Sequence, residues 1–256
     1  MRADGVVAKA GGKVVKNVAG YDLGKLIIGS FGTLAVATEA VFRLHPLPAA
    51  SRWVSTSVAD PARAQAAVQS VLHAQAVPAA IEVEWPAAGE GSVQVLLEGR
   101  EEGVEGRAAT VGALFGEAAQ TVHAPVDGAT YPWDTAATGD DRSTCLKLTF
   151  VLSGLADVLA TAREAGLHVR GSGGAGVVYA ALAPGTPVDE VRAAVNGIRE
   201  TCTRAGGSAV VMDAPASVKA AVDVWGPVPA LDLMGRVKNQ FDPDHRLAPG
   251  RFVGGI

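Results

Sequence analysis

The chain has 256 residues, of which 48% are hydrophobic and 19% are charged, and its formal net charge is −4. This length and composition predict one or two domains with a substantial core and exclude an intrinsically disordered chain. The slightly acidic charge gives no electrostatic basis for a nucleic-acid partner, and no apolar stretch reaches the roughly 20 residues of a membrane span.

The first 44 residues combine glycine-rich loops with an apolar run. Residues 1–15 alternate weakly around a Gly-Gly pair, which predicts a β-hairpin. A short amphipathic turn is expected at residues 23–28, before Gly29-Ser30-Phe31-Gly32-Thr33 and a strand-like run at residues 34–44. The two glycines around Ser30-Phe31 let backbone amides face outward, as a chain does when it approaches a phosphate or a flat ring. Glycine loops also simply turn corners, so the pattern alone leaves both interpretations open.

A proline-rich linker at residues 45–48 precedes two copies of one order of elements. The first copy has expected strands at 52–58, 80–85 and 92–98, with helices at 60–75 and 104–115. The second copy has expected strands at 145–152, 167–170, 176–182 and 208–212, with helices at 155–165 and 188–205. The repeated order predicts a duplicated ferredoxin-like α+β domain, with one antiparallel sheet and helices on one face.

The segment between the two copies, residues 122–141, is polar, irregular and aromatic. His123, Tyr131, Trp133 and Asp134 are candidates for the lining of a substrate entrance, because structureless loops of this length often serve function. A surface crossover held by Trp133 explains the same residues, so both interpretations stay open.

Residues 171–176 spell Gly-Ser-Gly-Gly-Ala-Gly, the spacing of a dinucleotide-binding loop. Such a loop needs a helix after it, whereas the run at residues 177–182 is β-like, so a hairpin is predicted instead. The tail is expected to form a helix with an apolar face at Leu233, Val237 and Phe241, which Asp242-Pro243 ends.

Metal and redox-cysteine chemistry find no support in the sequence. The five histidines are dispersed, so no metal site is expected. Cys145 and Cys202 are far apart and belong to no CxxC motif, which favours buried thiols in a reducing cytoplasm over a disulfide or an iron–sulfur site.

One long ordered motif runs from Asn17 to Thr38. It consists of Asn-Val-Ala-Gly-Tyr-Asp-Leu at 17–23, Leu26, and Gly-Ser-Phe-Gly-Thr-Leu-Ala-Val-Ala-Thr at 29–38. The motif resembles the end of the FAD-binding domain in FAD-linked oxidases of the vanillyl-alcohol oxidase type, most of all the glycolate oxidase FAD-binding subunit. Phe31 and Ala35 depart from the wider family, which tends to have Glu and Gly there. Residues 238–252 resemble the segment that returns to the flavin domain in these oxidases, with Ala248 in place of the usual Asn.

The resemblance implies an α+β chain made of the C-terminal part of a PCMH-type FAD-binding domain and a duplicated ferredoxin-like cap domain. The expected boundaries are 1–46 for the FAD-domain portion, 50–230 for the cap or substrate domain, and 231–256 for the returning segment. In the family, the glycine-rich loop that wraps the FAD pyrophosphate precedes this point, which implies N-terminal truncation.

The function that the resemblance implies is the FAD-dependent oxidation of a small 2-hydroxy acid to a 2-oxo acid, as in cytoplasmic glycolate catabolism. The expected flavin contacts, mostly through backbone atoms, are Gly20, Tyr21, Gly29, Ser30, Gly32, Thr33, Val36 and Arg251. The catalytic base stays unknown, because Arg170 and glycines stand near the hairpin where catalytic oxidases of the family carry a His-Gly-x-Gly motif. The expected partners are a catalytic flavoprotein and an iron–sulfur subunit.

The alternative is a non-catalytic assembly module of an oxidase complex. In this hypothesis the chain holds no FAD, because the N-terminal lobe of the flavin domain is missing, and it binds partner subunits instead.

Overall fold

The computed structural model describes residues 1–12, 21–122 and 131–256. The chain divides into two compact units. Unit 1 consists of residues 1–46 and 227–256, and unit 2 consists of residues 47–226.

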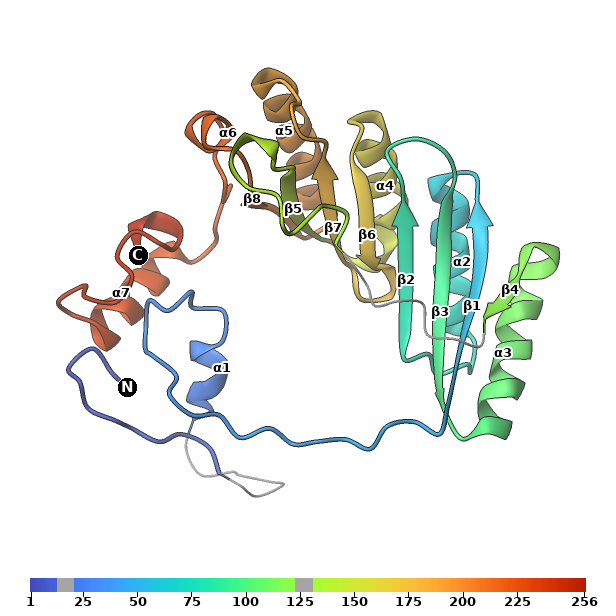
Figure 1. The fold of residues 1–256 in the computed structure, drawn as a ribbon, viewed down its shortest axis with the longest axis horizontal. Helices are drawn as coiled ribbons and strands as arrows, with labels where there is room; N and C mark the ends of the chain where they lie inside the picture. Colours follow the sequence, from blue (N-terminus) through green and yellow to red (C-terminus); the bar gives the residue numbers. More distant parts are fainter. Residues whose placement is uncertain (13–20, 123–130) are drawn as a thin grey trace. The chain divides into compact units, whose positions relative to one another are not determined.

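Unit 2 is built on one eight-stranded antiparallel sheet (Figure 1). Its strands are β1 (Ala50–Val58), β2 (Ala80–Trp85), β3 (Gly91–Gly99), β4 (Gln120–Val122), β5 (Thr144–Thr149), β6 (His168–Ser172), β7 (Val177–Leu182) and β8 (Ser208–Asp213). The order β4-β1-β3-β2-β6-β7-β5-β8 places four strands of ferredoxin-like order side by side with a second such set. The predicted duplication is confirmed, and the two halves join where β2 pairs with β6.

The helices of unit 2 cover one face of this sheet (Figure 1). They are α2 (Pro61–His73), α3 (Glu101–Phe115), α4 (Leu155–Glu164), α5 (Val188–Arg204) and the short α6 (Ala216–Ala221), with 3-10 turns at Gly116–Ala118, Gly139–Asp141, Leu152–Gly154 and Gly173–Ala175. The predicted start of α2 is confirmed, because the Asp60 carboxylate accepts a hydrogen bond from the Arg63 amide and Pro61 opens the helix. Strand β4 and helix α6 have no counterpart among the predicted elements.

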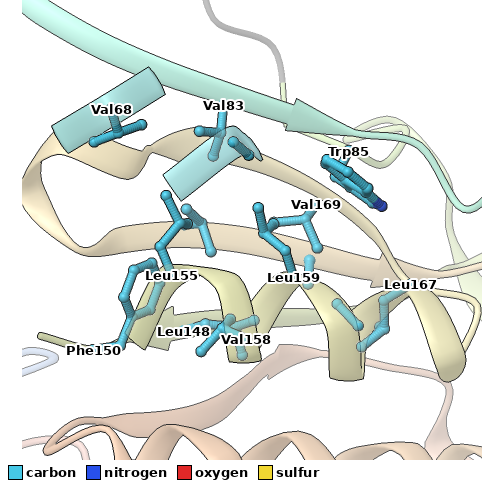
Figure 2. Close-up of a cluster of buried hydrophobic side chains, with 14 of the residues drawn as sticks. Val68, Val83, Trp85, Leu148, Phe150, Leu155, Val158, Leu159, Leu167 and Val169 are labelled. Carbon is cyan, nitrogen blue, oxygen red and sulfur yellow. The ribbon is translucent and has the colours of Figure 1, made fainter. Parts of the chain in front are cut away.

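One continuous core lies between the sheet and these helices. Alternate residues of β2 are buried, so Val83 and Trp85 face the helices while Glu82 and Glu84 face the opposite side. Figure 2 shows the side chains of Leu155 and Leu159 on α4 directed towards this layer. Both halves contribute to the same core, so the duplicated sheet buries its apolar face as one layer.

Among its described residues, unit 1 contains two helices, α1 (Leu23–Ile27) and α7 (Leu231–Phe241), and a 3-10 turn at Val253–Gly255. The predicted tail helix is confirmed, including its end at Asp242. The predicted strand at residues 34–44 was wrong: the segment has no assigned strand, because no neighbouring strand pairs with it in the described part of the chain. No hairpin strand forms within residues 1–12 either, and the rest of that predicted hairpin lies outside the described residues.

The glycine run at residues 171–176 forms the β6–β7 hairpin, as predicted, with the turn Gly173–Ala175 between the strands. These glycines are needed for packing. A Cβ added at Gly173 would lie 2.6 Å from Val83 Cγ1, and one added at Gly174 would lie 2.8 Å from Ile81 Cβ. The dinucleotide-like spacing therefore reflects close contact between a turn and a strand.

Replacing Gly174 with Ala should destabilise unit 2 by about 1–3 kcal/mol, because the added methyl overlaps Ile81 in a filled core. The matched control is Gly197→Ala in α5, where a Cβ meets no atom within 4 Å and the helix should gain up to about 1 kcal/mol. Urea unfolding of both variants measures the difference. Equal stability of the two variants would show that the turn has room for a side chain.

Candidate functional site

The loop Gly29–Thr33 in unit 1 has an unusual backbone. Gly29, Phe31 and Gly32 all have left-handed φ angles, of 81°, 55° and 78°. For Phe31 this conformation costs roughly 1–2 kcal/mol, because its Cβ crowds the backbone. Thr33 stabilises the turn, because its amide and its Oγ1 both donate to the Ser30 carbonyl, at 3.0 and 2.7 Å.

Two glycines leave one side of this loop open. A Cβ added at Gly29 or Gly32 would meet no atom within 4 Å. In the described part of the chain, neither glycine amide donates to an acceptor. Both glycines are exposed, and two exposed amides without an acceptor suit an anion or the polar edge of a ring system, so this loop fits a flavin cofactor.

The buried side chain of Lys238 holds the loop from α7. Its Nζ donates to the Thr33 carbonyl at 2.8 Å, to the Leu247 carbonyl at 2.9 Å and to Asp242 Oδ2 at 2.7 Å. All three ammonium hydrogens thus have an acceptor, which is what a buried cation requires. Both Lys238 and Asp242 are fully buried.

Asp242 completes this network. Its carboxylate also accepts hydrogen bonds from the amides of Arg246, at 3.0 Å, and Leu247, at 2.7 Å. Burial by itself would raise the pKa of Asp242, but the bonds from Lys238 and the two amides outweigh burial and lower that pKa to about 2. The carboxylate therefore stays charged throughout the physiological range.

The C-terminal segment contacts the loop a second time. The rings of Phe31 and Phe252 lie 5.4 Å apart, centroid to centroid. A largely apolar cavity of about 260 Å³ adjoins the loop, lined by Leu26, Ile28, Gly29, Ser30, Thr33, Leu34, Leu233, Met234, Val237, Phe252 and Ile256. Gly29, whose amide has no acceptor in the described part of the chain, thus lines an apolar cavity.

The residues predicted to contact flavin are unequally placed. Ser30 and Thr33 are buried within the loop, while Gly29 and Gly32 form its open side. Tyr21, Val36 and Arg251 are exposed, and Gly20 lies outside the described residues. The four loop residues are neighbours in sequence, and the ring contact of the C-terminal segment with this loop comes from Phe252, the residue after Arg251.

A second group of polar side chains lies on the open face of the sheet in unit 2. Glu84 and Arg170 face each other across β2 and β6, with 3.6 Å between Glu84 Oε2 and Arg170 Nε. Glu84 Oε1 lies 3.3 Å from His168 Nε2. Burial raises the pKa of the neighbouring Glu82, and the Ser172 hydrogen bond and the Arg170 charge offset part of that rise.

An aromatic cluster adjoins this polar group. Tyr131 and Trp133 stack at 4.6 Å, and both present an edge-on geometry to Tyr179, which pairs with Arg170 across β6 and β7. The segment between the two halves therefore packs on the sheet through Trp133, as one of the two interpretations had it. His123 lies outside the described residues, and the role of the segment as a substrate entrance stays a prediction.

The sequence pattern did not indicate Glu84 and His168 as site residues, and it marked Lys238 only as part of the segment at residues 238–252. The spacing of Lys238 and Asp242, four apart across a helix end, was a visible signal for an ion pair. The pairing of Glu84 with Arg170 had no such signal, because it depends on the contact between β2 and β6.

Both cysteines are buried free thiols, as predicted. Burial raises the pKa of Cys202 to about 12, and burial together with the charge of Asp213 raises the pKa of Cys145 to about 12. Neither thiol is therefore a ready nucleophile. Across the ranges that the structure describes, no three His, Cys, Asp or Glu side chains gather to hold a metal ion, and no helix is both long and apolar enough to cross a bilayer.

No protein-family model matches the chain. It is 38% identical to glycolate oxidase subunit GlcD of Bacillus subtilis over 80 residues, which are 31% of this chain and 17% of the relative. It is 56% identical to glycolate oxidase subunit GlcE of Escherichia coli over 41 residues, which are 16% of this chain and 12% of the relative. D-lactate dehydrogenase of Archaeoglobus fulgidus is 54% identical over 44 residues, which are 17% of this chain and 10% of the relative.

Each match thus spans less than a fifth of the relative's length. Among solved structures, alkyldihydroxyacetonephosphate synthase matches with a TM-score of 0.52 at 14% identity, over 93% of this chain and 52% of that chain. This likeness shows a shared fold and confirms the α+β class. The sequence matches confirm the resemblance to FAD-linked oxidases that the motif at residues 17–38 indicates.

We expect the Asp242 carboxylate to become protonated only at very low pH. Because its folded pKa of about 2 lies below the usual value, its contribution to stability is fully present above about pH 4 and is lost only as the pH falls towards 2. We expect the Arg246 and Leu247 amide NMR shifts to stay constant from neutral pH down to about pH 3. An inflection near pH 4, as for an exposed carboxylate, would contradict the buried pair, and Asp242→Asn serves as the control without a titrating group.

Proposed function

We propose that the chain is an FAD-linked oxidoreductase subunit, similar to the subunits of glycolate oxidase, which oxidises a small 2-hydroxy acid to a 2-oxo acid. In this proposal residues 1–46 and 231–256 are a portion of the FAD-binding domain, and residues 50–230 are the cap or substrate domain. A catalytic flavoprotein and an iron–sulfur subunit are the proposed partners. The two free thiols support a reducing, cytoplasmic setting.

The observation that carries this proposal is the 56% identity over 41 residues with a glycolate oxidase subunit. The glycine loop supports it, because the amides of Gly29 and Gly32 have no acceptor in the described part of the chain and both residues are exposed. The proposed flavin contacts are Gly20, Tyr21, Gly29, Ser30, Gly32, Thr33, Val36 and Arg251. When bound, FAD would supply the acceptor for the hydride that leaves the substrate carbon.

A specific observation favours the alternative function as an assembly module. The segment at residues 41–44 exposes Val41, Phe42 and Leu44, with 60%, 81% and 89% of their surfaces accessible. Large exposed apolar side chains in succession favour a protein partner. Both functions can share the partners named above, and they differ in whether this chain holds FAD.

The first test is the visible absorption spectrum of the purified full chain after incubation with FAD and desalting. We expect flavin bands to remain with the protein, because the loop amides and the adjoining hollow bind the cofactor. Glycolate and D-lactate should then bleach these bands under anaerobic conditions. A colourless protein would overturn the oxidoreductase proposal and favour the assembly module.

A further inference from the structure

Lys238 is buried although its side chain carries a positive charge. The side chain is 1% exposed, and that of Asp242, four residues later, has no exposed surface. Taking two charges out of water is costly, and apolar residues of similar size often stabilise a fold equally well or better. The buried ion pair of Lys238 and Asp242 is therefore best explained by the positions in which it holds the backbone groups that it binds.

That geometry joins three segments of unit 1. The ammonium of Lys238 binds the carbonyls of Thr33 and Leu247, and Asp242 binds the amide of Leu247. A single side chain on α7 therefore fixes the end of the glycine loop relative to the C-terminal segment. Apolar packing would fill the same volume without fixing where a carbonyl points.

The loop needs such an anchor, because its backbone is strained. Phe31 has a φ of 55°, and the glycines on both sides of Ser30-Phe31 allow many other conformations. Lys238 holds the loop at Thr33, and Phe252 packs against it at Phe31. Together these contacts preserve the arrangement in which Gly29 and Gly32 are exposed and their amides have no acceptor in the described part of the chain.

We propose that Lys238, supported by Asp242, is a positioning residue that presets the loop Gly29–Thr33 for its ligand, so that it controls cofactor affinity more than folding. This inference rests on the proposed function only for the identity of the ligand, FAD. The positioning itself is a property of the free chain.

The experiment replaces the pair in the full-length chain by Lys238→Met with Asp242→Leu, which removes both charges and leaves neither one buried alone. Lys219→Met is the matched control, because Lys219 forms an exposed ion pair with Asp213 in unit 2. Asp242→Asn is a second, isosteric variant that keeps the shape and removes the charge. Circular dichroism and urea unfolding report on folding in each variant.

Two further readouts decide the proposal. Hydrogen exchange followed by NMR should be at least tenfold faster at the hydrogen-bonded amides of Ser30 and Thr33 in the double variant than in the parent chain, and FAD titration should show Kd about 10 to 100 times higher. Asp242→Asn should shift both in the same direction, and Lys219→Met should shift neither. The absorption bands of bound flavin should also change shape in the double variant, since its surroundings become less fixed.

Three results would overturn the inference: unchanged exchange in the loop, an FAD affinity within twofold of the parent, or loss of the folded unit in both Asp242→Asn and the double variant. The last would make the pair a folding element. If the parent chain binds no FAD, the proposed function fails, while the exchange data still decide whether Lys238 positions the loop.

Discussion

The pairing of β2 with β6 is the contact on which unit 2 depends. Without it, each half would be a four-stranded sheet with an unpaired edge, and the helices of the two halves would cover separate cores. With it, α2 packs against α4 and α4 against α5, over a single apolar layer. The glycines at 173 and 174 make the join close, because they let the β6–β7 turn lie directly against Val83 and Ile81.

The same pairing creates the polar group on the open face. Glu84 and Arg170 belong to different halves, yet they face each other in register and bring His168 within reach of a carboxylate. The two halves have different residues where β2 meets β6, so the polar group at this junction is formed by unlike side chains from the two copies. Charged side chains at the centre of a sheet face are unusual enough to motivate a functional role.

Unit 1 is stabilised differently, because within the described residues it contains little regular structure and no paired strand. Its order depends on hydrogen bonds to one buried ion pair and on the contact between two phenylalanines. The left-handed backbone of Phe31 is strained, and it is tolerated because these contacts hold the loop in one conformation. The matched relatives are far longer than the shared segments, so the interpretation of unit 1 rests on the loop itself.

The sequence by itself determined the α+β class, the duplication and most element boundaries, because alternating burial and helix caps such as Asp60 are local signals. It also marked the glycine loop. Only the tertiary structure decided that residues 34–44 form no strand, since a strand needs a partner, and that Lys238 reaches Thr33, 205 positions away. Such long-range pairings depend on how the chain folds back, which no local pattern encodes.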